Sequence, residues 1–276
     1  MVEKKHLLTS VQMANFVADG FLRFDELIPE EINREVMREL DNRLINFGYE
    51  PQGQPLTNLW QDSQGIGKVI RMPEVEGIIQ SLLGIDPLYD HHCPHQVGPG
   101  HLEGQVWHAD AIIDTRQHFD IQLFYFPHDT PREMGGTMFL PGSHLRRIHE
   151  TDIGRYQNFI GQVPVVCKAG TLFVGHHGIW HCAQPNKTDK LRYMFKIRLN
   201  PTVRQLKMWN TDDLEDERIG GILFRNHRWY GNDDRLEYAN RIKFWRFLIG
   251  DPQFDVNYWL TRIENTPERR VLAGVG

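Results

Sequence analysis

Two histidines and an aspartate stand at a spacing that fits a metal site. The segment Trp107-His108-Ala109-Asp110 places an imidazole and a carboxylate two residues apart, and on a β-strand both side chains would project from the same face. A further histidine, His181, follows in GIWHCAQPN. Two histidines and one carboxylate form the facial triad of non-haem Fe(II) sites, which leaves positions open for a cosubstrate and O2. We predict that His108, Asp110 and His181 bind a metal ion.

The spacing alone is a weak signal. A His-x-Asp triplet is common by chance, the chain has 14 histidines, and an ordinary hydrogen-bonding role is the alternative for each ligand. Neighbouring histidines on a strand point to opposite faces, so the pair His176-His177 is not expected to bind one metal ion. Ser143-His144 lacks the context of a nucleophile elbow and lies in a turn-forming neighbourhood.

Longer motifs make the pattern more specific. They are WHAD, GGTMFLPGSH, GTLFVGHHGIWHCAQPN and LRYMFKIRLNP, and Arg192 stands eleven residues after His181. Together they resemble the phytanoyl-CoA dioxygenase family of Fe(II)/2-oxoglutarate oxygenases. The opening QMANFVADGFLRFDELIPEE is similar to the helix-strand start of that family. The resemblance therefore spans roughly residues 10 to 201.

The resemblance implies a fold and a set of site residues. The fold is a double-stranded β-helix, also called a jelly roll or cupin-like fold, with the metal site at one open end. His108 and Asp110 correspond to the first two iron ligands and His181 to the third. Arg192 corresponds to the basic residue that binds the distal carboxylate of 2-oxoglutarate. A guanidinium suits this role because its planar fork grips a carboxylate through two parallel hydrogen bonds.

Other cosubstrate contacts are less well defined. Phe124 falls where the family often has an aromatic wall beside 2-oxoglutarate. Ala183 replaces a small polar residue that the family often has two positions after the distal histidine, so one hydrogen bond must be lost or supplied elsewhere. Thr137, Gln122 and His92 are the alternative suppliers.

Asp110 bears on the reaction. In related halogenating enzymes a small residue replaces the carboxylate, so an intact Asp110 favours hydroxylation of a small organic substrate. By the chemistry that the resemblance implies, Fe(II) and O2 convert 2-oxoglutarate to succinate and CO2. Desaturation, cyclisation and epimerisation at the same iron site are alternatives. A non-catalytic metal- or ligand-binding barrel and a zinc hydrolase are rivals from other classes, but a hydrolase leaves GGTMFLPGSH and Arg192 without a role.

The strand that begins near Arg192 suggests a property of the substrate. Met194, Lys196 and Arg198 share the parity of Arg192, so on a regular strand they face the same side. Positive charge would then line the substrate mouth and favour an anionic substrate. A twist or bulge that turns Lys196 or Arg198 into solvent is the alternative.

The elements that position these residues change along the chain. Apolar spacing predicts helices over 10–19, from Pro29 to about Phe47, and over 75–83, with a strand at 21–24 and a loop over 48–67. Residues 87–201 consist of short runs typical of antiparallel strands, which predicts a sandwich or barrel. The predicted strands cover 105–113, 119–126, 136–140, 163–167, 171–174 and 191–199. A helix is predicted over about 234–249, where Leu236, Ile242, Trp245 and Leu248 make one apolar face.

We expect one domain with three parts. Helices occupy residues 1–86, the jelly-roll core 87–201 and a helical extension 202–276, so the fold class is mainly β with flanking helices. The extension lies outside the resemblance, and packing on the outer face of the barrel is preferred over a lid or a dimer surface. Its aromatic residues are Trp229, Tyr230, Phe244, Trp245, Tyr258 and Trp259.

Composition excludes several partners. The formal charge of −5 comes without a basic block, which argues against nucleic acid. No apolar run approaches the length of a membrane span, and no signal core follows the first residues, so a cytoplasmic location is expected. Cys93, Cys167 and Cys182 are too few and too far apart for a disulfide framework. The sequence leaves the oligomeric state and the identity of the substrate open.

Overall fold

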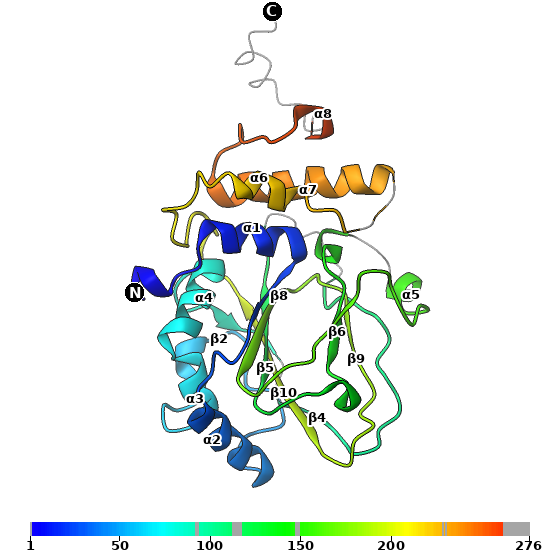
Figure 1. The fold of residues 1–276 in the computed structure, drawn as a ribbon. Coiled ribbons are helices and arrows are strands. Elements are labelled where there is room, and N and C mark those ends of the chain that lie inside the picture. The colour runs from blue at the N-terminus through cyan, green and yellow to red at the C-terminus, as the bar shows by residue number, and fades with distance from the viewer. Residues whose placement is uncertain are drawn as a thin grey trace, which may run out of the picture.

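The structure is a computed structural model that describes residues 2–91, 94–111, 118–146, 150–227, 229 and 231–261. Antiparallel β-sheets lie at its centre, with helices around them (Figure 1). The larger sheet has the order β1-β8-β5-β10-β3-β2, with β4 also paired to β10, and the smaller sheet has the order β7-β6-β9. The strands are β1 (Phe21–Phe24), β2 (Gln54–Pro55), β3 (Leu88–Tyr89), β4 (Pro94–Val97), β5 (Ile121–Phe126), β6 (Thr137–Phe139), β7 (Val163–Pro164), β8 (Thr171–His176), β9 (His181–Ala183) and β10 (Arg192–Asn200).

Helices occupy both ends of the described chain. The α-helices are α1 (Ser10–Asp19), α2 (Glu30–Asp41), α3 (Gly65–Ile70), α4 (Pro73–Leu83), α5 (Glu150–Ile153), α6 (Arg218–Leu223), α7 (Asn232–Ile249) and α8 (Tyr258–Thr261). Short 3-10 helices are η1 (Lys4–His6), η2 (Leu56–Asn58), η3 (Arg132–Met134) and η4 (Ser143–Leu145). No helix of the described residues is both long enough and apolar enough to cross a membrane.

The first helix and strand form as predicted. Thr9 and Gln12 make a capping box in which each side chain accepts from the backbone N–H of the other, which satisfies donors that the helix leaves free. Gly20 ends α1 in the left-handed region at φ +82°, where glycine carries no steric penalty. The chain then enters β1 directly.

The second helix is shorter than predicted. It ends at Asp41 instead of near Phe47, and Arg43 takes a left-handed conformation at φ +55°. Leu44, the last residue of the predicted apolar stripe, is 61% exposed. Without burial of Leu44, no packing energy maintains a further turn of helix.

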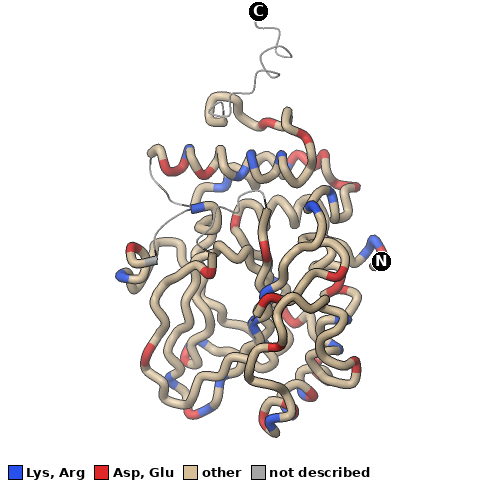
Figure 2. The backbone as a smooth tube through the Cα atoms, turned by 180° about the vertical axis from the view of Figure 1, so that it is seen from behind, with Lys and Arg blue, Asp and Glu red and all other residues tan. Residues whose placement is uncertain are grey.

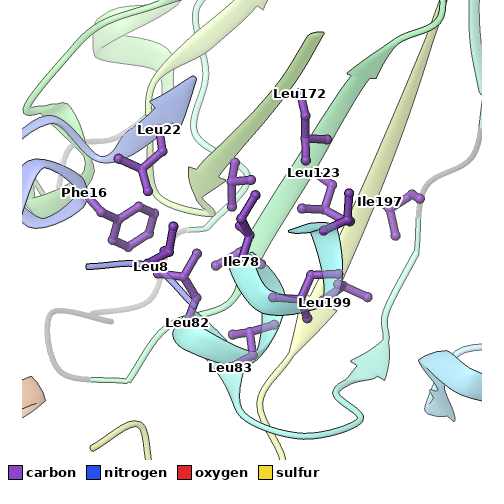
Figure 3. Close-up of a cluster of buried hydrophobic side chains, with 14 of the residues drawn as sticks. Leu8, Phe16, Leu22, Ile78, Leu82, Leu83, Leu123, Leu172, Ile197 and Leu199 are labelled. Carbon is purple, nitrogen blue, oxygen red and sulfur yellow. The ribbon is translucent and has the colours of Figure 1, made fainter. Parts of the chain in front are cut away.

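The larger sheet is covered on both faces. On one face, side chains of α1 and α4 pack against β5, β8 and β10 in the cluster of Figure 3, which includes Phe16, Ile78, Leu123, Leu172 and Ile197. On the other face, a second cluster joins Phe124, Phe126 and Phe173 to Phe139 of the smaller sheet. Every residue of β5 is therefore buried, since neither face meets water.

The C-terminal extension packs as helices at one end of the sheets. Figure 1 shows α6 and α7 beside α1, and contacts join α7 to α1, α6 and η4. The helix predicted over 234–249 is present, with Ile242, Trp245 and Leu248 buried, but Leu236 is 48% exposed and lies outside the packed face. Tyr258 and Trp259 are exposed, while Tyr230 lies outside the described residues.

Some predicted strands are wrong. The run predicted over 105–113 forms no strand in its described part, 105–111, and only His108 makes an isolated bridge, to His181. The predicted loop over 48–67 holds β2, η2 and the start of α3, while β3, β4 and β9 were not predicted. These three strands have two to four residues, too few for a period-two pattern to stand out.

In the described chain, basic and acidic residues are interspersed along the backbone (Figure 2).

Candidate active site

The three predicted ligands lie together between the sheets. Their donor atoms are all within 4.8 Å of one another. Asp110 Oδ1 is 3.6 Å from His108 Nε2, and Asp110 Oδ2 is 3.6 Å from His181 Nε2. The backbone N–H of each histidine donates to the carbonyl of the other, at 3.1 and 2.9 Å. This bridge, rather than the strand expected from the sequence, brings the ligands together.

Both imidazoles present the same nitrogen to the site. His108 Nδ1 is 2.9 Å from the carbonyl oxygen of Val106, and His181 Nδ1 is 3.0 Å from that of Ile179. A carbonyl only accepts, so each Nδ1 carries a proton and each Nε2 keeps a lone pair directed at the site. Such bonds orient the histidine ligands of metal ions in proteins.

The protonation states also suit a metal ion. Burial, together with the charge of Lys196, lowers the pKa of His181 to about 3, so this ring is neutral at physiological pH. Burial alone would raise the pKa of Asp110, but the charge and the hydrogen bond of Lys196 outweigh it and hold that pKa well below its usual range. A neutral imidazole and an ionised carboxylate are the forms in which histidine and aspartate bind metal. The donor set therefore fits Fe(II).

Two other side chains hold Asp110. The Gln122 amide donates to Asp110 Oδ2, and Lys196 Nζ donates to the same oxygen at 2.5 Å. Gln122 is fully buried and lies beside this ligand, outside the lining of the cavity described next. Gln122 is therefore a partner of Asp110, and its predicted contact to 2-oxoglutarate stays a prediction.

A cavity of about 320 Å³ opens next to the triad, which is within the usual range of small-molecule pockets. Phe124 and Thr137, both singled out in the sequence, line it together with Arg192. The Phe124 ring packs edge-on against His181 with centroids 5.6 Å apart. Sequence reasoning missed His95, Gln96, Val97, His101, Glu103, Gly104 and Gln105, which also line the cavity.

Arg192 is a buried cation at the wall of this cavity. Its side chain is 5% exposed, and Nη1 donates to the carbonyl oxygens of Met134 and Gln184, both at 2.9 Å. Among the described residues no carboxylate pairs with it. Burial lowers its pKa to about 10, so the guanidinium stays charged at neutral pH. A buried charge without a counter-ion is costly, and an anion in the cavity would offset that cost.

Thr137 stands opposite the alanine that breaks the family pattern. It pairs with Ala183 across β6 and β9. The Thr137 hydroxyl lies 3.5 Å from Met194 Sδ, and a thioether is a weak acceptor. This hydroxyl is therefore well placed to replace the missing polar group. His92, another predicted supplier, lies outside the described residues.

The inward face of β10 carries the charges that its parity predicted. Lys196 is 5% exposed and bound to Asp110. Arg198 pairs with Asp120 at 2.7 Å and with Asp90 at 3.1 Å. Both cations therefore have carboxylate partners within the protein, and only Arg192 faces the cavity without one among the described residues.

Comparison with known proteins places the chain. Residues 20–194 match the family described as Phytanoyl-CoA dioxygenase (PhyH), which is more than half of the sequence. The chain belongs to this family. It is therefore an Fe(II)/2-oxoglutarate-dependent dioxygenase, and its cofactors are Fe(II), 2-oxoglutarate and O2. No curated protein sequence matches the chain significantly.

Solved structures show the same fold at low sequence identity. The epimerase SnoN, solved with Fe3+, alpha ketoglutarate and nogalamycin RO, is 18% identical with a TM-score of 0.54, over 70% of this chain and 83% of SnoN. HygX from Streptomyces hygroscopicus, solved with nickel and 2-oxoglutarate, is 14% identical with a TM-score of 0.56, over 77% of this chain and 93% of HygX. The non-heme monooxygenase ThoJ, as a nickel complex, is 18% identical with a TM-score of 0.53, over 84% of this chain and 96% of ThoJ. These likenesses confirm the predicted jelly-roll fold class.

Proposed function

We propose that this dioxygenase hydroxylates an unactivated carbon of a small organic substrate. His108, Asp110 and His181 hold Fe(II), and Arg192 binds the distal carboxylate of 2-oxoglutarate. Bound iron supplies the activation of O2 that couples conversion of 2-oxoglutarate to succinate and CO2 with oxidation of the substrate. The observation that carries the proposal is the buried Arg192 guanidinium, which faces the cavity beside the three ligands.

The protein's own residues prepare this chemistry. The carbonyls of Val106 and Ile179 fix the imidazole orientations through Nδ1, so that both Nε2 lone pairs are preorganised. Gln122 holds the Asp110 carboxylate from one side. The ring of Phe124 is fully buried against His181 and excludes water from that side of the centre.

Hydroxylation is preferred over halogenation because Asp110 is retained. A carboxylate ligand leaves no iron position for a halide. Desaturation, cyclisation and epimerisation stay alternatives, and the fold itself is shared with proteins described as an epimerase and as a monooxygenase. A barrel without turnover is disfavoured because the triad and Arg192 are all in place.

The nature of the substrate stays a prediction. The prediction of an anionic substrate was based on the cationic side chains of the inward face of β10. The carboxylate partners of Lys196 and Arg198 reduce the positive charge that is free to attract such a substrate. A cytoplasmic location and the organisation as one domain, with parts 1–86, 87–201 and 202–276, are likewise proposals. The contacts of α7 with α1 support the single domain.

Turnover with a compound library tests the function. The protein is reconstituted with Fe(II) and 2-oxoglutarate, candidate compounds are added in air, and succinate release and product mass are measured. We expect one class of compound to stimulate succinate release and to gain a single oxygen atom. A product that has lost two hydrogens, or has changed configuration without gaining oxygen, would replace hydroxylation by an alternative. An Asp110→Ala variant is the matched control and should release no stimulated succinate.

A further inference from the structure

Lys196 occupies an unusual place between the metal ligands and the cosubstrate cavity. Its buried ammonium is 2.5 Å from Asp110 Oδ2 and 3.1 Å from His181 Nε2. The same side chain lines the cavity that Arg192 borders. A lysine therefore contacts donor atoms of two of the three ligands and reaches the space assigned to 2-oxoglutarate.

The contact with His181 competes directly with metal binding. His181 Nδ1 keeps the ring proton on the carbonyl oxygen of Ile179, so Nε2 has a single lone pair. That lone pair either accepts a hydrogen from Lys196 or binds a metal ion. Asp110 Oδ2 is similarly engaged, since it accepts from both Lys196 and Gln122. A metal ion that binds His181 must displace the ammonium from this nitrogen.

Charge balance indicates what receives the displaced ammonium. With Fe(II) alone, the single negative charge of Asp110 faces a divalent ion and Lys196, and like charges at short range repel in a buried site. The dianion 2-oxoglutarate adds two carboxylates to the cavity that Lys196 borders. Arg192 lies four residues earlier on the same face of β10, roughly 13 Å away along the strand at about 3.3 Å per residue. Two long cationic side chains from these positions can reach opposite ends of a short dicarboxylate.

We propose that Lys196 is an internal counter-cation that competes with Fe(II) at the triad and couples metal binding to 2-oxoglutarate binding. Without the cosubstrate, the ammonium holds two ligands and opposes the metal ion. When 2-oxoglutarate is present, one of its carboxylates receives the ammonium and the opposition is relieved. The inference rests on the proposed function, because it takes the three ligands and the cavity as assigned there.

Metal affinity, rather than turnover, tests this role. Fe(II) binding is measured anaerobically by equilibrium dialysis, with and without 2-oxoglutarate, for the wild type, Lys196→Met and Lys196→Gln. Lys168→Met is the matched control, because Lys168 is exposed and pairs with Asp129. Without 2-oxoglutarate we expect both Lys196 variants to bind Fe(II) at least tenfold more tightly than the wild type. The factor by which 2-oxoglutarate tightens Fe(II) binding should be smaller in these variants, and the control should match the wild type.

Two results would overturn the inference. One is unchanged or weaker Fe(II) binding by the Lys196 variants without 2-oxoglutarate, which would make the lysine a support of Asp110. The other is a coupling factor equal to that of the wild type. Thermal unfolding checks that the variants fold. If Lys196→Met does not fold, the Fe(II) affinity of Lys196→Gln decides the test. Wild-type protein that binds no Fe(II) under either condition would instead refute the proposed function.

Discussion

Removal of the Arg192 guanidinium should weaken 2-oxoglutarate binding strongly while the metal site stays intact. The side chain is 5% exposed and has no carboxylate partner among the described residues, so a cosubstrate carboxylate would be its counter-ion. Truncating one partner of a buried, hydrogen-bonded charge pair costs about 2–4 kcal/mol. This corresponds to a Kd for 2-oxoglutarate that rises about 30- to 1000-fold in Arg192→Met. Arg192→Lys keeps the positive charge but lacks the planar guanidinium that binds a carboxylate through two hydrogen bonds, so its loss of affinity for 2-oxoglutarate should be smaller than that of Arg192→Met.

The assay follows the visible charge-transfer band of the Fe(II)–2-oxoglutarate complex under anaerobic conditions. Arg198→Gln is the control on the same strand, because Arg198 already pairs with Asp90 and Asp120, and its Kd should equal that of the wild type. Fe(II) binding without cosubstrate should persist in Arg192→Met. A Kd for 2-oxoglutarate that is unchanged in Arg192→Met would refute the reasoning, as would an equal loss in Arg198→Gln.

Three further predictions concern the cosubstrate pocket and the fold. Thr137→Val should raise the Kd for 2-oxoglutarate by about tenfold, the loss of roughly one hydrogen bond, and an unchanged Kd in the same titration would exclude the hydroxyl as the substitute at Ala183. Gly20→Ala should destabilise the protein by about 2–4 kcal/mol in urea unfolding, because a Cβ there meets the His144 ring and Ile179 at φ +82°. Gly161→Ala, at φ +86° in open space, should cost only about 1 kcal/mol, and equal losses would contradict the packing argument. Burial lowers the pKa of His144 to about 3 from 6.5, so the unfolded chain takes up the proton first as the pH falls. The contribution of neutral His144 to the free energy of unfolding is fully present above pH 6.5 and declines by about 1.4 kcal/mol per pH unit towards pH 3. His144→Gln should therefore lose less stability than the wild type, by about 2 kcal/mol, between pH 7 and pH 5, and identical losses would argue against a neutral buried His144.

Local signals in the sequence were sufficient where one interaction decides the structure. The Thr9 cap and the Gly20 stop defined α1 to the residue, because a cap and a left-handed glycine act within one turn. Parity along β10 correctly placed Lys196 on the same side as Arg192, since side chains alternate on a regular strand. The same parity could not show that Asp110 pairs with Lys196, or that Asp120 pairs with Arg198.

Tertiary contacts decided what the sequence could not. His108 and His181 meet through a backbone bridge between them, a long-range pairing that no local pattern encodes. Gln122 was proposed as a contact to 2-oxoglutarate, and its hydrogen bond to Asp110 could not be predicted, because the pairing of β5 with β10 brings it there. Lys196 was expected at a substrate mouth, and its contact with His181 follows only from the packed sheets.

The most direct test of the central claim is an anaerobic crystal structure of the protein with Fe(II) and 2-oxoglutarate. The account predicts one metal ion bound by His108 Nε2, Asp110 and His181 Nε2, with the distal carboxylate of 2-oxoglutarate on Arg192. Metal density away from these three residues, or 2-oxoglutarate bound without contact to Arg192, would contradict it.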